Sequence, residues 1–101
     1  MKSGFGKLTL ANQEYYEGSF KEGCKHGEGK YIWNKTKETY FGNFNFDKRE
    51  GLGMYYWADG GYFKGEWRAD RMNGYGRLVK DGLDVLGEFY ADHFTKEVEE
   101  Q

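Results

Sequence analysis

The chain has 101 residues, of which 15 are basic and 17 acidic, so its formal net charge is −2 at pH 7. The length suits a single domain, and the mixed charges argue against a nucleic-acid-binding protein, which normally carries a basic stripe. Aromatic residues make up 20% of the chain, which also has 16 glycines and no proline. Since Leu, Ile and Val are few, we expect rings to form the core.

The predicted elements, in chain order, are eight strands joined by charged or glycine-rich turns. Alternating apolar positions place the strands at 4–10, 15–20, 27–33, 39–44, 51–57, 61–67, 74–80 and 84–89. Asp59-Gly60 and Asp81-Gly82 are hairpin-turn signals, because positive φ is accessible there. In the tail, 91–101, Phe94 and Val98 stand four apart among charged residues. This spacing predicts a short amphipathic helix that covers the last sheet edge.

Two short motifs recur along the chain at a period of 22–24 residues. An aromatic-x-Gly unit begins at Tyr16, Tyr40 and Phe63 and recurs in degraded form at Val85, and Gly-x-Gly units begin at positions 4, 27, 51 and 74. Each full aromatic-x-Gly precedes the next Gly-x-Gly by 11 residues, whereas the return spacing varies from 11 to 13. A fixed spacing indicates a hairpin whose turn sets the register, and a variable one indicates a looser link.

The combination of these motifs resembles the MORN repeat, most closely at 16–29, where YEGSFKEGCKHGEG stands. Full repeats are expected at 16–39, 40–62 and 63–84, with partial units at 4–15 and 85–90. Together they make a repeat sheet over 1–90, followed by the tail 91–101. The chain departs from the pattern where the histidine before Gly-x-Gly occurs only as His26 and where Val85 replaces the ring. The end units are therefore expected to act as caps.

The resemblance and the strand pattern predict an all-β fold, an elongated single-layer antiparallel meander. We expect each ring to lie over a glycine of the neighbouring strand, since aromatic cover of strand glycines stabilises sheets. If Gly18 pairs with Gly29, then Tyr16 opposes Tyr31 and Phe20 opposes Gly27.

Two faces of this sheet are candidate binding surfaces, because one layer cannot bury both. The first is an aromatic groove predicted to bind protein, formed by Tyr16, Phe20, Tyr31, Trp33, Tyr40, Phe44, Tyr55, Trp57, Phe63 and Trp67. The second is the opposite face, with Ile32, Phe41, Met54, Tyr56, Tyr75 and Leu86. The structural alternative for the rings of the first set is that they form the core.

Catalytic, cofactor and metal sites are not expected. One cysteine and two histidines cannot supply a convincing tetrahedral metal site, so Cys24, Lys25 and His26 are interpreted as turn residues. The Gly-x-Gly pairs do not continue as dinucleotide-binding fingerprints. With a single cysteine, no apolar N-terminal run and no stretch of membrane-spanning length, we expect a cytoplasmic chain that is not secreted.

The resemblance implies a non-enzymatic protein-interaction scaffold or a small structural subunit of a larger assembly, in a cytoskeletal or ciliary setting. A partner segment would dock in the aromatic groove. The alternative is a peripheral phospholipid-binding module that uses basic side chains of the fixed turns, namely Lys21, Lys25, Lys48, Arg49, Arg68 and Arg71. Pairing between open sheet ends would also allow a homodimer.

Overall fold

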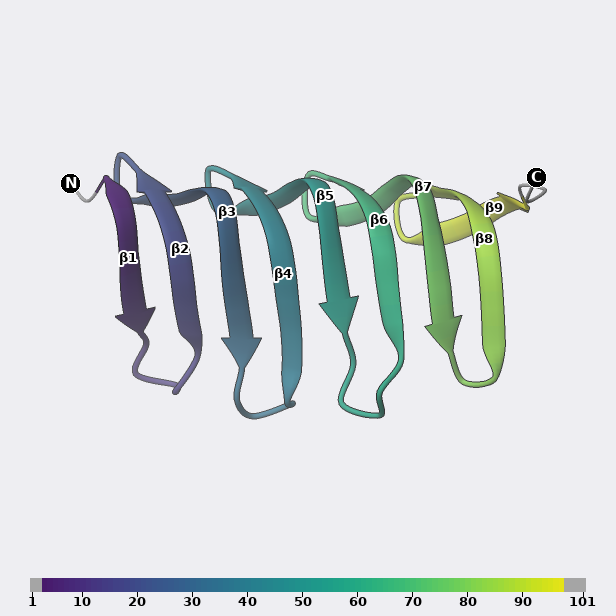
Figure 1. Cartoon of the computed structure of the whole chain (residues 1–101), viewed down its shortest axis with the longest axis horizontal. Helices are drawn as coiled ribbons and strands as arrows, with labels where there is room; N and C mark the ends of the chain where they lie inside the picture. The colour runs from purple at the N-terminus through teal and green to yellow at the C-terminus, as the bar shows by residue number, and fades with distance from the viewer. Residues whose placement is uncertain (1–2, 98–101) are drawn as a thin grey trace.

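One antiparallel sheet makes up the protein in the computed structural model, which describes residues 3–97 (Figure 1). Nine strands follow one another in chain order, each paired with its neighbours. Their bounds are β1 Gly4–Thr9, β2 Tyr15–Lys21, β3 Cys24–Trp33, β4 Glu38–Asn45, β5 Lys48–Tyr56, β6 Tyr62–Arg68, β7 Arg71–Lys80, β8 Leu83–Tyr90 and β9 His93–Glu97. The predicted all-β meander is therefore confirmed, and its longest dimension is 45 Å.

The register aligns one glycine from each of β1 to β8 in a continuous row across the sheet. The members of this glycine row are Gly6, Gly18, Gly29, Gly42, Gly53, Gly65, Gly76 and Gly87. The predicted pairings of Gly18 with Gly29 and of Tyr16 with Tyr31 are confirmed. Both sequence motifs thus contribute to one line of backbone that has no side chains.

Rings fill the space that the missing side chains leave. Tyr16 lies over Gly29, and a methyl group on that glycine would come within 3.0 Å of the ring, a separation that Cβ atoms essentially never show. Tyr40 covers Gly53 and Phe63 covers Gly76 in the same way. The predicted cover of glycine by rings is confirmed in all three full repeats.

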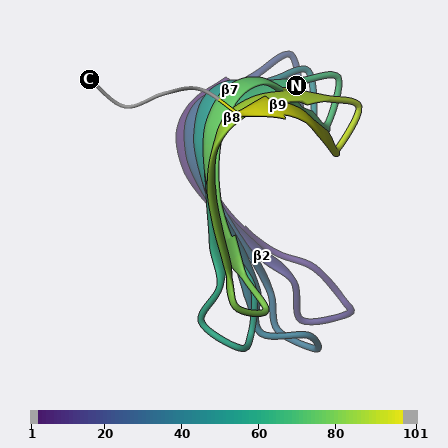
Figure 2. The same cartoon turned by 90° about the vertical axis from the view of Figure 1, so that its right-hand side faces the viewer.

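A β-bulge directly after the glycine row bends β2, β4 and β6. The ring centroids of Tyr16 and Phe20 are 5.0 Å apart, although residues four apart in a flat strand are separated by about 13 Å. The strands therefore curve toward the rings, and the end-on view in Figure 2 is a hook. We call the ring side the inner face and the opposite side the outer face. The bulge also corrects one prediction: Phe20 opposes Lys25, not Gly27.

The fixed turns are shorter than predicted, because each consists of only two residues. Phe46-Asp47 has φ values of 44° and 72°, and Ala69-Asp70 has 49° and 73°. Positive φ at both central residues defines the type I′ hairpin turn, whose twist matches the flanking strands. The strands therefore continue almost to the turn, and Cys24, Lys25 and His26 begin β3 instead of forming a turn. The fixed 11-residue spacing follows from this tight connection.

Each aspartate at the second turn position binds the preceding repeat. The Asp70 N–H donates to the Arg49 carbonyl (3.0 Å), and the Arg49 N–H donates to Asp70 Oδ1 (3.2 Å). Asp47 makes the same two bonds with Lys25, and Asp92 makes them with Met72. We call this arrangement the aspartate clip. It joins successive turns into a second line of contact parallel to the glycine row.

The predicted C-terminal helix is wrong for the described part of the tail, where β9 forms instead. Ala91-Asp92 has φ values of 48° and 73° and makes another type I′ turn. The chain then folds back and Phe94 pairs with Phe89, in the place that Lys25 takes opposite Phe20. The repeat geometry therefore outweighs the helical spacing of Phe94 and Val98. Val98 itself lies outside the described residues.

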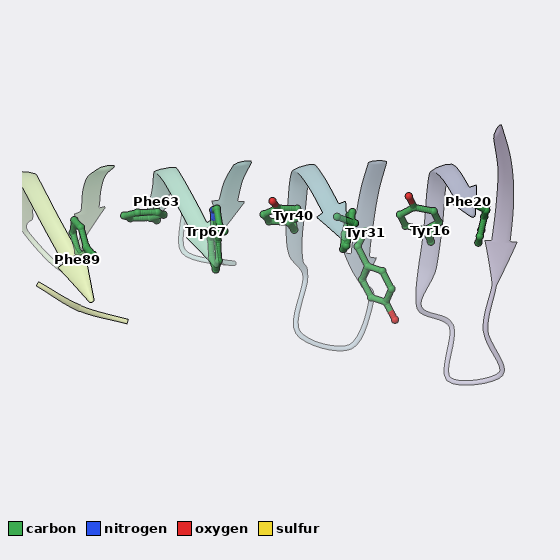
Figure 3. Close-up of a cluster of buried hydrophobic side chains, with 8 residues drawn as sticks. Tyr16, Phe20, Tyr31, Tyr40, Phe63, Trp67 and Phe89 are labelled. Carbon is green, nitrogen blue, oxygen red and sulfur yellow. The ribbon is translucent and has the colours of Figure 1, made fainter. Parts of the chain in front are cut away.

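Eight rings form the core along the inner face: Tyr16, Phe20, Tyr31, Tyr40, Phe44, Phe63, Trp67 and Phe89. Figure 3 shows them as a row along the sheet. Edge-to-face contacts link them between repeats, with ring centroids 5.3 Å apart for Tyr16–Phe44 and 5.4 Å for Tyr40–Trp67. Such pairs contribute about 0.5–1.5 kcal/mol each beyond their buried area. The core is thus one-dimensional, and each repeat depends on the next.

Candidate functional site

The inner face uses most of its predicted binding residues as core. Seven of the ten are buried: Tyr16, Phe20, Tyr31, Tyr40, Phe44, Phe63 and Trp67. The other three, Trp33, Tyr55 and Trp57, are partly buried and pack against this core. Ring surface for a partner is therefore confined to these three, and docking on the inner face stays a prediction.

Three cations cover rings of the inner face and reduce the ring surface that a partner could contact, and one of them, Lys80, lies 4.4 Å from the centroid of Trp57. The Lys25 ammonium lies 5.3 Å from the centroid of Tyr31, and the Arg49 guanidinium lies 4.5 Å from that of Trp67. Arg49 Nε also binds Asp70 Oδ1 at 2.6 Å. Partial burial tends to raise the pKa of Asp70, but its bonds to Arg49 outweigh this and lower it below its usual value. These charges are paired between successive repeats.

Two tyrosine hydroxyls on the inner face, one in each of the first two repeats, are hydrogen-bonded to backbone carbonyl groups. Tyr16 and Tyr40 donate to the Ser19 and Asn43 carbonyls at 2.8 and 2.9 Å, beside the two bulges. Burial, reinforced by the charge of Asp47, raises the pKa of Tyr16 to about 12. The rings are thus held as neutral donors at physiological pH, and they serve structure more directly than chemistry.

The outer face carries a shallow groove that crosses the strands from β3 to β8, with a volume of about 680 Å³. Its floor is the glycine row at Gly42, Gly53, Gly65 and Gly76. One side of the groove, the first wall, consists of Phe41, Met54, Lys64, Arg77 and Leu86. The other side, the second wall, consists of Glu28, Asn43, Leu52 and Tyr75. We call this hollow the outer groove.

Large apolar side chains are unusually exposed along the outer groove. Leu52 has 66% of its surface accessible, Phe41 59% and Tyr75 58%. Contiguous apolar surface of this kind marks interaction sites on soluble proteins. The bend explains the hollow, because curvature toward the inner face spreads the two walls apart on the outer face.

Most of the predicted second face lies in or beside this groove. Phe41, Met54, Tyr75 and Leu86 line the outer groove itself. Ile32 and Tyr56 line a smaller neighbouring hollow together with Phe41 and Met54. Leu52 was missed as a candidate, although it is the middle residue of a Gly-x-Gly unit, as Tyr75 is. That position could have identified it.

The remaining candidate features are less concentrated. Of the six basic turn residues, Lys25 and Arg49 are bound by aspartates and rings, whereas Lys21, Lys48, Arg68 and Arg71 are exposed. Residues 3–97 contain no group of three His, Cys, Asp or Glu side chains placed to hold a metal ion. Nor does this part of the chain contain a helix able to cross a membrane.

Comparison with known proteins agrees with the repeat geometry. A family model described as the MORN repeat matches residues 16–35, 40–62 and 63–83. The chain belongs to the MORN-repeat family. MORN repeat-containing protein 3 from Xenopus laevis is 36% identical over 71 residues, which are 64% of this chain and 30% of that protein. Alsin from Rattus norvegicus is 33% identical over 79 residues, 74% of this chain and 5% of that protein.

The chain therefore spans less than a third of the length of either relative. The matched segments begin at Tyr16, Tyr40 and Phe63, the rings that cover Gly29, Gly53 and Gly76. In MORN terms, the two walls of the outer groove come largely from the variable x positions of the two motifs. The recurring motif residues determine the bend and therefore the groove, whereas the residues at the x positions determine the chemistry of its walls.

Proposed function

We infer that this chain is a non-enzymatic protein-interaction scaffold, a small structural subunit that binds a partner through the outer groove. The observation that carries this proposal is the exposure of Phe41, Leu52 and Tyr75 around a floor of bare glycine backbone. A single-layer sheet has no second layer of its own to cover such a surface. A partner would supply that layer.

The outer groove is favoured over the aromatic groove of the inner face for a physical reason. Buried rings such as Tyr40 and Phe63 are already packed against neighbouring repeats. Arg49 also lies over the Tyr40 ring, and a partner that displaced it would break its ion pair with Asp70. The outer groove requires no such rearrangement.

The setting of the partner is taken from the family. A cytoskeletal or ciliary assembly is the setting that the MORN resemblance favours. The lipid alternative depends on exposed turn cations such as Lys48 and Arg68. Acidic residues near them in the sequence reduce the net positive charge of the turns. Flotation with phosphatidylserine vesicles at low salt tests it separately, and we expect the chain to stay unbound.

A cross-linking pull-down from the native cell, with two pairs of bait variants, tests the proposal. The groove variant is Leu52→Glu/Tyr75→Glu. The matched control is Leu83→Glu/Tyr90→Glu, which changes a Leu and a Tyr of similar exposure, 57% and 69%, outside the outer groove. Circular dichroism and thermal midpoints first establish that both variants fold.

We expect wild type and the control to capture the same defined proteins and the groove variant to lose them. Capture that the groove variant retains would refute docking at the outer groove. If a folded Trp57→Ala variant alone lost the partners, the inner face would be the docking surface instead.

A further inference from the structure

The two walls of the outer groove carry opposite charge. Lys30, which lines the smaller neighbouring hollow, continues the row of the first wall, so that the register places Lys30, Phe41, Met54, Lys64, Arg77 and Leu86 side by side in that order. This row carries three cations, of which Lys30 stands opposite Glu17 of β2 and Arg77 is bound to Asp84 at 2.9 Å. Lys30 and Lys64 are exposed and make no ion pair with any other residue in 3–97.

The second wall has the opposite sign. Glu28 pairs with Asn43, Leu52 with Glu66, and Tyr75 with Glu88 along this side of the glycine row. The row contains three carboxylates, the last of which, Glu88, stands opposite Lys96 of β9. Apolar side chains alternate with the charges on both walls, so the groove is an apolar trough with one basic and one acidic edge.

The floor of the groove determines which backbone can lie in it. Gly42, Gly53, Gly65 and Gly76 are paired on both sides within the sheet, so their N–H and C=O groups are not available to a ligand. An extended partner would have to leave its own backbone groups unpaired on this apolar surface. A helix satisfies its backbone internally, and helix-in-groove binding is the corresponding mode of peptide recognition.

The length of the trough sets the length of the helix. From Phe41 on β4 to Leu86 on β8 there are four inter-strand steps of about 4.8 Å, or roughly 19 Å. At about 1.5 Å per residue, roughly 13 helical residues span this distance. Such a segment places apolar residues at i, i+3, i+4 and i+7 on the surface that faces the glycine floor.

We propose that the outer groove binds an amphipathic helix that lies across the strands, with acidic residues along the edge facing Lys30 and Lys64 and basic residues along the edge facing Glu28. This inference rests on the proposed scaffold function and adds the chemistry and orientation of the partner segment. Charge complementarity of this kind sets binding orientation and discriminates between partners.

Three synthetic peptides of about 14 residues test the proposal on the intact chain. The segregated peptide is a hydrocarbon-stapled helix with leucines on one face, glutamates on one flank and lysines on the other. The mixed peptide is stapled and has the same composition, with both charges on each flank. Simple exchange of the flanks is not a valid control, because a helix bound in the reverse direction would restore the match. The third peptide has the segregated sequence with a central D-proline and cannot form the helix.

Titration calorimetry gives the affinities, and methyl chemical shifts of Met54, Leu52 and Leu86 show the binding site. We expect the segregated helix to bind about tenfold tighter than the mixed helix, which corresponds to about 1.4 kcal/mol. The Lys30→Glu/Lys64→Glu variant should lose most of this preference. The matched variant Lys35→Glu/Lys48→Glu makes the same change in net charge at exposed sites outside the groove and should keep it.

The opposing outcomes are distinct. Equal affinity of the two helices overturns the charge argument, and equal affinity of the D-proline peptide overturns the helix. If no peptide binds, or binding shifts only inner-face residues, the inference is overturned. The scaffold function itself is judged by the Leu52→Glu/Tyr75→Glu capture experiment, so it can survive the failure of this inference.

Discussion

Replacement of Gly53 by alanine tests the packing of the ring core most directly. A methyl group on Gly53 would lie closer than 3.0 Å to three atoms of the Tyr40 side chain, which are its nearest neighbours. Tyr40 is completely buried, and its hydroxyl donates to the Asn43 carbonyl at 2.9 Å. Its ring makes edge contacts with Phe44 and Trp67 at 5.1 and 5.4 Å. The ring therefore cannot yield without losing these contacts.

The expected cost follows from the interactions that the displaced ring gives up. Overpacking in a dense core costs about 1–3 kcal/mol, and the weakened hydrogen bond and ring pairs add about 1 kcal/mol each. Alanine recovers about 0.5–1 kcal/mol relative to glycine in the unfolded chain. The net loss is about 3 kcal/mol, which for a domain of this size lowers the thermal midpoint by roughly 12–24 °C.

A double-mutant cycle isolates the clash from other effects of the substitution. Urea unfolding of wild type, Gly53→Ala, Tyr40→Ala and the double variant gives four free energies of unfolding. Without the ring there is room for the methyl group, so Gly53→Ala should be nearly neutral in the Tyr40→Ala background. We therefore expect a coupling energy of about 3 kcal/mol. Additive losses, or a wild-type midpoint for Gly53→Ala, would refute the account of rings packed over glycines.

Three further predictions concern the hydroxyls, the aspartate clip and the cations of the inner face. Tyr40→Phe should lose about 1 kcal/mol in urea unfolding, and Phe63→Tyr should gain a similar amount by donating to the carbonyl three residues ahead; two changes of the same sign would contradict this. Bonds to Arg49 lower the pKa of Asp70, so its stabilisation is complete above the unfolded pKa of about 4 and is lost as pH falls further. Asp70→Asn should therefore lose less stability than wild type between about pH 5 and pH 2, and parallel curves would refute it. Arg49→Met should lower the free energy of unfolding by about 1–2 kcal/mol, whereas Arg49→Lys, which keeps the charge, should lose less; equal losses would exclude a contribution from charge.

Much of the fold could be predicted from the sequence because two motifs at a fixed spacing specify the strand register. The pairing of Gly18 with Gly29 and the ring cover of glycine follow directly from that spacing. The type I′ turns were missed because Phe46-Asp47 and Ala69-Asp70 lack the glycine that usually marks them. The tail was missed for the same reason, since Ala91-Asp92 is equivalent to Ala69-Asp70 only once the turn is known.

The binding surfaces were harder to predict because alternation assigns residues to faces but not to burial. The bulge brings Tyr40 to 5.1 Å from Phe44 and closes the inner face around its rings, which no alternation pattern indicates. The same bend opens the outer face, so Leu52 is exposed although it lies between two motif glycines. Curvature, set by the bulge in each of the hairpins β2–β3, β4–β5 and β6–β7, therefore decides which face is core and which is available.

The curvature also explains why the recurring motif residues of this chain form the core while its x residues line the outer groove. The ring positions must cover glycine and contact the next repeat, so their chemistry varies only between Tyr and Phe in the three full repeats. The x residues of the aromatic-x-Gly units, Glu17, Phe41, Lys64 and Leu86, share no chemistry. No packing requirement on the inner face constrains them, because they point to the other side of the sheet. A groove with one basic and one acidic edge can therefore be formed on the outer face without any change to the core that bends the sheet.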